Sequence, residues 1–167
     1  MFEEILQELN RRKVKYLVVG GLAVNLHGFY RLTADLDIIL LLQDGNIRNF
    51  VKAVKRLRLV PRIPVKIEDF AIAALRRVWI KDKNMKAFTF YDPGFQSKYL
   101  DVVIDHPINF SKAFRRRKIF RDRGLVVPVM DIANLIKMKK SAGRARDQLD
   151  IIGLKQIEEL GRDQKEK

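Results

Sequence analysis

The 167-residue sequence contains no cysteine and only two histidines. The absence of cysteine excludes disulfides, iron–sulfur clusters and thiol nucleophiles, and two histidines do not make a multi-histidine metal site. Any metal ion would therefore be held by carboxylates. The sequence also lacks an apolar run long enough to cross a membrane, and residues 1–4 (Met-Phe-Glu-Glu) are acidic where a signal peptide would be basic and then apolar. We therefore expect a cytoplasmic protein with no membrane partner.

Acidic residues are in the minority, with 20 Asp and Glu against 34 Lys and Arg, a net charge of +14 and a pI near 10.2. This balance favours polyanionic partners such as nucleic acid or nucleotides, and it equally fits the solvated, ion-pair-rich surface of a heat-adapted protein. The length suits one domain with its own core. We expect a single domain over residues 1–160 and a frayed tail over residues 161–167, where apolar side chains are almost absent.

Apolar periodicity predicts an α/β (α+β) fold with a mixed sheet. The expected strands cover residues 16–19, 38–42, 86–91, 99–104 and 125–129, and a turn at residues 92–94 joins the third and fourth into a hairpin. The expected helices cover residues 2–11, 22–27, 47–57, 68–77, 111–117, 132–139 and 147–160. Asn46, Ser111 and Asp131 are the predicted caps of three of them.

Two acidic residues, Asp35 and Asp37, enter the second expected strand two positions apart. Because strand side chains alternate, both carboxylates point to one face, a geometry that suits hard divalent cations such as Mg²⁺. An Asp-x-Asp pair is common by chance, so its context carries the argument. Here a strand ends in Gly20-Gly21, a short helix follows, and the chain returns directly into the acidic pair. Adjacent glycines allow backbone amides to approach a triphosphate closely.

This arrangement resembles the first motif of the DNA polymerase β-like nucleotidyltransferase superfamily, in which a Gly-Gly or Gly-Ser turn and a variable helix precede Asp-x-Asp on the next strand. The matching segments are residues 19–21 (Val-Gly-Gly) and 31–37 (Arg-Leu-Thr-Ala-Asp-Leu-Asp). They are most similar to the small bacterial and archaeal branch that includes abortive-infection and toxin-type nucleotidyltransferases. The resemblance extends over residues 16–154 and implies a nucleotidyltransferase fold, with helices packed against a mixed sheet.

The resemblance implies transfer of a nucleoside monophosphate from an NTP by two-metal chemistry with Mg²⁺ or Mn²⁺. In that scheme Asp35 and Asp37 ligate both metals. A third carboxylate on a later strand completes the catalytic metal site and accepts the proton of the attacking hydroxyl. Asp101 is the favoured match for this carboxylate, and Asp105, which shares its strand face by parity, is the alternative.

The nucleotide-binding residues implied by the resemblance begin with Gly20 and Gly21, followed by Arg31 and Thr33. Arg31 and Thr33 lie where they would touch phosphate or shape the loop. A structural ion pair is an equally open reading for Arg31.

A second cluster follows Asp131, where helical periodicity directs Lys139 inward. This lysine would either face phosphate in the cleft or extend along apolar surface to reach water. Residues 135–150 resemble the terminal motif of the same small family, which favours the first reading. We predict that Arg144 and Asp147 form an ion pair between helices.

The densest basic run comprises residues 115–118 with Arg121 and Arg123, and Phe114 and Phe120 are interspersed with it. It is either a nucleic-acid contact or a solvated face over core phenylalanines. His27 is read as a packing residue, and His106 is given no role.

The acceptor implied by the resemblance is RNA, particularly tRNA as in toxin-type relatives, or a protein side chain. The alternative function is a catalytically idle nucleotide- or RNA-binding module of a toxin–antitoxin or two-component system, with a cognate antitoxin as its partner. Carboxylates at all three expected positions favour the enzyme.

Overall fold

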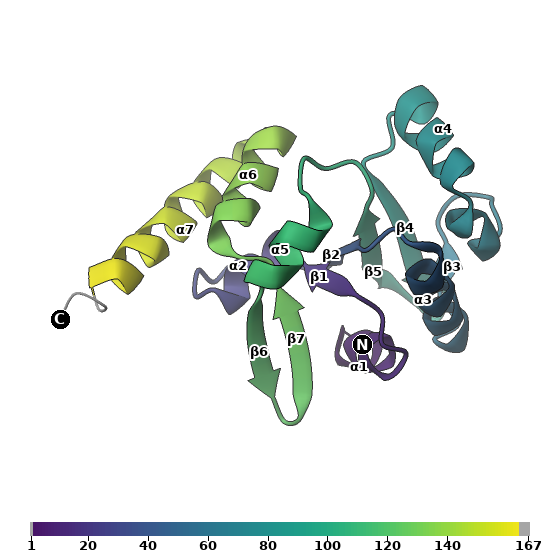
Figure 1. Cartoon of the computed structure of the whole chain (residues 1–167), viewed down its shortest axis with the longest axis horizontal. Coiled ribbons are helices and arrows are strands. Elements are labelled where there is room, and N and C mark those ends of the chain that lie inside the picture. The colour runs from purple at the N-terminus through teal and green to yellow at the C-terminus, as the bar shows by residue number, and fades with distance from the viewer. Residues whose placement is uncertain (1, 164–167) are drawn as a thin grey trace.

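The computed structural model describes residues 2–163, without the side chains of residues 95–98, 162 and 163. Figure 1 shows a central sheet with helices around it. The elements are α1 (Phe2–Arg11), β1 (Tyr16–Val18), α2 (Gly20–Leu26), β2 (Leu36–Leu40), α3 (Asp44–Arg56), β3 (Val60–Pro61), the 3₁₀ helix η1 (Ile67–Ala71), α4 (Ala73–Lys83), β4 (Ala87–Asp92), β5 (Phe95–Val103), α5 (Phe110–Arg116), β6 (Lys118–Asp122), β7 (Leu125–Val129), α6 (Ile132–Ala142) and α7 (Ala145–Asp163).

The sheet is mixed, which confirms the predicted fold class. Over the described residues its seven strands run in the order β3-β4-β5-β2-β1-β7-β6. The pairs β2–β5 and β1–β7 are parallel and the other pairs are antiparallel. The parallel register makes Asp37 of β2 and Asp101 of β5 direct neighbours. Two carboxylates far apart in the sequence therefore meet at the centre of the sheet.

The core lies on both faces of the central strands. All three residues of β1 are buried, as are four of the five in β2. Phe50, Phe70, Phe88 and Phe90 form a buried aromatic cluster beneath α3 and η1, with ring centroids of Phe70 and Phe88 5.1 Å apart. Such pairs stabilise the core beyond their buried area. No helix within residues 2–163 combines the length and the apolarity needed to span a membrane.

Two of the three predicted helix caps are wrong. Gln43 is the residue before α3, and Asn46 lies inside its first turn, where its side chain bonds the backbone of Lys15 and Leu41. The cap of α5 is Asn109, whose side chain accepts the backbone N–H of Lys112 at 3.0 Å, in place of Ser111. Asp131 caps α6 as predicted, accepting the N–H of Asn134 at 3.2 Å.

Other differences concern element boundaries. The helix expected over residues 68–77 is divided into η1 and α4 by Ile72, whose backbone is extended. Strand β6 occupies part of the basic run, where no strand was expected. Helix α7 continues through Asp163, beyond the start of the predicted tail, and residues 164–167 lie outside the described residues.

Candidate active site

The glycine pair begins α2 directly after β1, and both residues are in close contact with side chains from the following loop and strand. Gly20 has φ +63°, and a Cβ there would lie 1.9 Å from Oδ2 of Asp37. A Cβ at Gly21 would lie 2.6 Å from Nη2 of Arg31 and 2.7 Å from Oγ1 of Thr33. No other residue type fits at either position without displacing these groups. The glycines therefore allow Asp37, Arg31 and Thr33 to pack on the backbone.

The three predicted carboxylates share one region of the sheet. Asp35 precedes β2, Asp37 lies within it, and Asp101 is its neighbour on β5. Burial, together with the charges of Asp101 and Asp35, raises the pKa of Asp37 to about 6. Burial and then the charge of Asp101 also raise the pKa of Asp35. Burial and neighbouring negative charge therefore disfavour the ionised forms of Asp35 and Asp37.

Two oxygens of this group are buried without a hydrogen-bond partner among the described residues, Oδ1 of Asp35 and Oδ1 of Asp101. Within residues 2–163, no three His, Asp or Glu side chains stand close enough to hold a metal ion between them. Mg²⁺ commonly binds through one or two carboxylates and completes its shell with water and substrate phosphates. Unpartnered carboxylate oxygens of this kind fit such an ion, and Mn²⁺ takes the same donors.

Asp105, the alternative third carboxylate, lies beyond the end of β5. Its Oδ2 accepts a hydrogen bond from Nζ of Lys86 at 2.5 Å, and its side chain is more than a third exposed. An exposed, ion-paired carboxylate has its charge already compensated. The geometry therefore favours Asp101, which has no such cation.

A pocket of about 410 Å³ opens over the glycine pair, and a smaller one of about 230 Å³ adjoins it over Asp35 and Asp101. The larger pocket is walled by Leu135 and Met138 of α6. A cavity of this size, part apolar and part polar, is typical of small-molecule sites. The charged residues common to both pockets are Arg31, Asp37, Lys86, Arg144 and Arg146.

Lys139 points inward, as its helical position predicts, and its side chain is buried at the edge of the larger pocket. Its Nζ lies 2.6 Å from Oδ2 of Asp150 and 3.4 Å from Oδ1 of Asp147. Oδ1 of Asp150 in turn lies 3.0 Å from Nε of Arg31. One buried carboxylate therefore joins the two cations predicted to bind nucleotide.

The predicted ion pair between Arg144 and Asp147 is wrong. Asp147 is buried and accepts from Lys139 and, at 3.3 Å, from the backbone N–H of Arg144. The guanidinium of Arg144 makes no ion pair in the described structure and borders the pockets. Asp147 pairs with the buried Lys139 in place of Arg144.

Sequence reasoning gave no role to two residues that shape this site, Asn25 and Asp150. Asn25 donates to the carbonyl of Arg31 at 2.8 Å and accepts its N–H at 2.9 Å, which fixes the loop after α2. Nothing in the local sequence signals this contact. Asp150 was detectable, because its spacing from Asp147 places both carboxylates on one helix face opposite an inward lysine.

The remaining candidates lie away from the pockets or at their rim. His27 packs edge-on against Phe120 and bonds the carbonyl of Met130 at 2.8 Å, as a packing residue should. His106 borders the larger pocket. In the basic run, Arg117 lies over the ring of Phe114 at 4.0 Å, while Arg115 is exposed.

Residues 1–164 match the model of a family described as "Nucleotidyltransferase of unknown function (DUF6036)". The chain belongs to this nucleotidyltransferase family. The predicted nucleotidyltransferase assignment is therefore confirmed, whereas the DNA polymerase β-like character and the toxin-type branch stay predictions. No curated protein matches the sequence.

Similar solved structures include a nucleotidyltransferase-like protein and two structures of ANT(2″)-Ia. A crystal structure of an antigenic nucleotidyltransferase-like protein from Paracoccidioides brasiliensis is 16% identical, with a TM-score of 0.53, over 91% of this chain and 72% of that one. A crystal structure of ANT(2″)-Ia in complex with adenylyl-2″-tobramycin is 11% identical, with a TM-score of 0.55, over 95% and 91%. A solution structure of the antibiotic-resistance factor ANT(2″)-Ia is 11% identical, with a TM-score of 0.53, over 98% and 90%. At these identities the likeness shows the fold.

Proposed function

We propose that this protein transfers a nucleoside monophosphate from an NTP to an acceptor, with Asp35, Asp37 and Asp101 as the catalytic carboxylates. The observation that carries the proposal is the register of β2 and β5, which sets Asp101 beside Asp37. One buried oxygen of Asp101 has no hydrogen-bond partner among the described residues. Family membership supports nucleotide transfer in general. ANT(2″)-Ia, which has the same fold, has been solved with adenylyl-2″-tobramycin, a ligand that carries an adenylyl group.

The proposed role of each residue follows from its place in the site. Asp35, Asp37 and Asp101 would hold Mg²⁺ or Mn²⁺, and the bound metal would neutralise charge on the transferring phosphoryl group. Asp101 accepts the proton of the attacking hydroxyl, a role that its unpartnered oxygen permits. Gly20 and Gly21 line the larger pocket together with Asp37, so their backbone borders the space proposed for phosphate.

Thr33, Arg31 and Lys139 complete the proposed nucleotide site. Thr33 donates to the carbonyl of Asp35 at 3.4 Å and sets the start of β2. Arg31 and Lys139 line the larger pocket with positive charge. Because Asp150 holds both, they present fixed donors to a phosphate group and lose little entropy on binding it.

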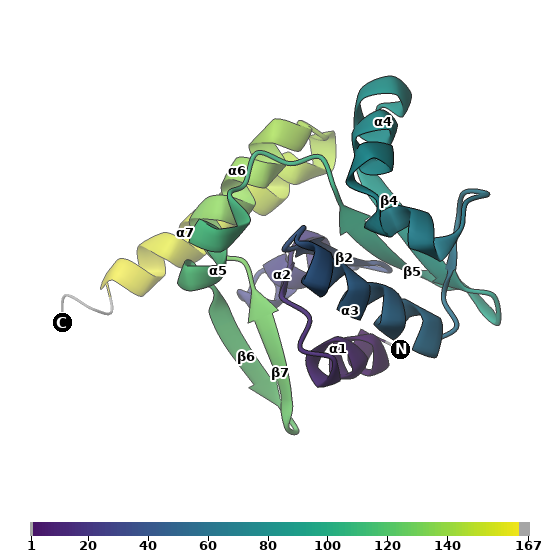
Figure 2. The same cartoon turned by 45° about the vertical axis from the view of Figure 1, so that its right-hand side comes forward.

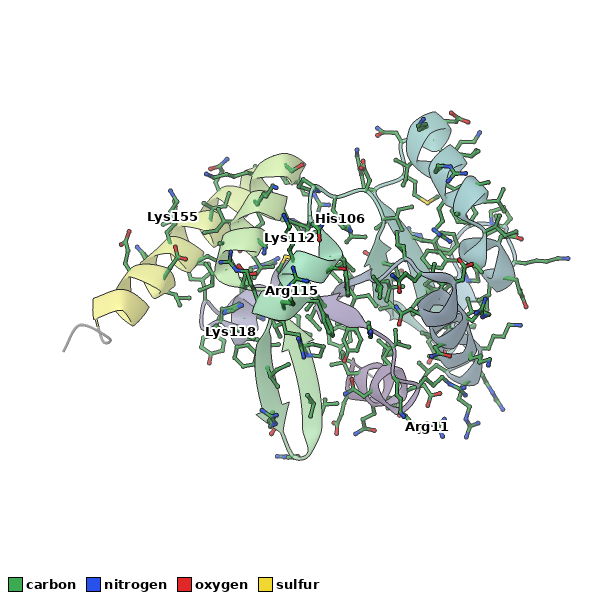
Figure 3. All side chains as sticks on the ribbon, in the orientation of Figure 1. Arg11, His106, Lys112, Arg115, Lys118 and Lys155 are labelled. Carbon is green, nitrogen blue, oxygen red and sulfur yellow. The ribbon has the colours of Figure 1, made fainter. Side chains whose placement is uncertain are left out.

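The acceptor we propose is RNA. Residues 106–121 carry six Lys and Arg and no acidic residue, and they begin at His106 on the wall of the larger pocket. Figure 3 shows Lys112, Arg115 and Lys118 following His106 along one face. Exposed cations that follow the wall of the proposed transfer site suit a phosphate backbone better than a protein side chain.

The deciding experiment is incubation of the protein with each α-labelled NTP, Mg²⁺ or Mn²⁺, and total RNA or total protein. We expect label on RNA. Asp101→Asn should lower turnover by about two to four orders of magnitude with little change in NTP affinity, since general base and metal ligand are lost together. Asp105→Asn is the matched control and should keep its activity.

Two outcomes would contradict the proposal. Damage confined to Asp105→Asn would move the catalytic role to the end of β5. NTP or RNA binding without labelled product under any condition would favour the idle binding module, alone or with an antitoxin partner.

A further inference from the structure

Most cations around the two pockets have their charge compensated by an acidic partner. Arg31 and Lys139 share Asp150, with Asp147 as a second partner of Lys139. Lys86 pairs with Asp105. Their acidic partners therefore offset part of the positive potential that these groups offer to a substrate with several negative charges.

Arg144 and Arg146 differ from those cations. Both line both pockets, both are exposed, and within residues 2–163 neither belongs to an ion pair with a described side chain. Both arginines share the smaller pocket with Asp35 and Asp37, so they border the acidic pair directly. Arg62 lines neither pocket, and its guanidinium lies over the ring of Tyr99.

The connection that carries these arginines is fixed by buried groups. Gly143 ends α6 with φ +64°, and Asp147 accepts the backbone N–H of Arg144 while it also receives Lys139. Figure 2 shows α6 and α7 side by side, so this short connection stands at one end of the pair. The arginine backbones are thus held in place although their side chains reach solvent.

The same placement is unfavourable for α7 itself. Arg144 immediately precedes the helix and Arg146 lies in its first turn. The helix dipole favours acidic groups at this end and disfavours cations. An anion bound between the two guanidinium groups would reverse that unfavourable interaction.

We propose that Arg144 and Arg146 together bind the triphosphate of the donor nucleotide. The inference deepens the proposed function and rests on it. Guanidinium groups bind phosphate oxygens through paired hydrogen bonds, which a flexible lysine does not reproduce. The three carboxylates repel a triphosphate, and these two arginines are the cations placed to oppose that repulsion.

The test compares two double variants with equal loss of charge. Arg144→Gln with Arg146→Gln should weaken binding of Mg²⁺–ATP, –GTP, –CTP or –UTP, whichever the wild type binds, by at least about tenfold in calorimetry. Affinity for the corresponding monophosphate should change less than about twofold. Lys137→Gln with Lys140→Gln, exposed on α6 and outside both pockets, is the control and should keep triphosphate affinity within about twofold.

A conservative variant separates charge from geometry. Arg144→Lys with Arg146→Lys should recover only part of the triphosphate affinity, because the paired donors are lost. Triphosphate binding equal to that of the control pair would overturn the inference, and so would an equal loss of monophosphate binding. If the wild type transfers nucleotide and the arginine variants bind like the control, only the role of the arginines fails; if the wild type binds no NTP, the proposed function fails with it.

Discussion

The ionised carboxylate of Asp37 is needed for the proposed chemistry, but it lowers the stability of the fold. This carboxylate is partly buried beside two other acids, and its pKa is raised to about 6. This pKa is higher than the ordinary value of 3.8, so the fold disfavours the ionised carboxylate relative to the unfolded chain. The metal-free protein therefore loses stability as pH rises from about 4 through about 6, and a metal ion would relieve this loss.

We predict that Asp37→Asn stabilises the metal-free protein at pH 8 by about 1 to 2 kcal/mol, after allowance for water at the pocket mouth. The advantage should shrink at pH 5, where the wild-type carboxyl is largely protonated. Urea unfolding in EDTA at both pH values measures the difference. The exposed Asp105→Asn should not show this gain at pH 8, and an Asp37→Asn effect that is the same at both pH values would argue against a raised pKa.

At this scale, the acidic pair and the glycines were predicted from the order of turn, helix and strand around them, since turn, strand parity and carboxylate chemistry are local properties. That order did not reveal Asn25 or the free arginines. Asn25 contacts Arg31 within one loop but has no sequence signal for it. The position of the arginines depends on α7 packing beside the loop after α2, a contact that joins distant parts of the chain. The predicted pair of Arg144 and Asp147 failed for the same reason, because Lys139 competes for the carboxylate.

At the scale of elements, α7 packs against the candidate-site loop between α2 and β2, and a glycine inside the helix makes the close contact possible. A Cβ at Gly153 would lie 2.4 Å from the ring of Phe29, in the loop that carries Arg31. Glycine is a poor helix former, so its presence here reflects the need for close approach. Helix α7 therefore positions the loop by contact and by the ion pair between Arg31 and Asp150.

We predict that Gly153→Ala lowers the free energy of unfolding by about 1 to 2 kcal/mol, because overpacking against Phe29 outweighs the better helix propensity of alanine. It should also weaken NTP binding as the loop shifts. Chemical unfolding and calorimetry measure the two effects.

Gly161→Ala is the matched control in the same helix, since nothing lies within 4 Å of a Cβ there. It should be neutral or stabilising. Combining Gly153→Ala with Phe29→Ala should remove the clash, and two equally destabilised glycine variants would contradict this account.

Element prediction succeeded where a segment has clear apolar periodicity, as in α1, whose expected and observed bounds agree. It failed at Asn46 and Ser111, where several polar residues precede a helix and the choice among them depends on backbone geometry. Strand β6 was missed because its basic composition suggested a helix face. Pairing with β7 satisfies the backbone hydrogen bonds of β6, and the composition of β6 does not predict this pairing.

For the whole molecule, the question is whether the net charge of +14 is concentrated on one binding surface or spread over the whole surface. The structure reduces the free part of the basic run, because Arg117 stacks on Phe114 and Arg116 lies 3.7 Å from Asp131. Lys112, Arg115 and Lys118 stay exposed on the face shown in Figure 3. They are the cations best placed to contact an acceptor that reaches the pocket.

We predict that changing Lys112, Arg115 and Lys118 to Gln weakens RNA binding by at least about tenfold at 0.1 M salt. It should also reduce the steepness of the salt dependence, since each phosphate contact in a single strand contributes a slope of about −0.7. Filter binding across a salt series measures both quantities.

The control with equal charge loss changes Arg48, Lys52 and Arg56 to Gln on the exposed face of α3. It should lower affinity much less. Equal losses in both triple variants would mean that the charge acts as a diffuse field, and the acceptor would then be sought among proteins.

The order of the site residues along the chain has a consequence for synthesis. The acidic pair leaves the ribosome early, Asp101 follows only with β5, and Asp150 comes with α7 near the end. Domains assemble as their segments emerge from the N-terminal side. A nascent chain that lacks α7 has the three carboxylates but nothing to hold Arg31 and Lys139. Under the proposed function, nucleotide transfer would therefore require a chain that already includes α7, and a product truncated before α7 would be inactive toward the acceptor.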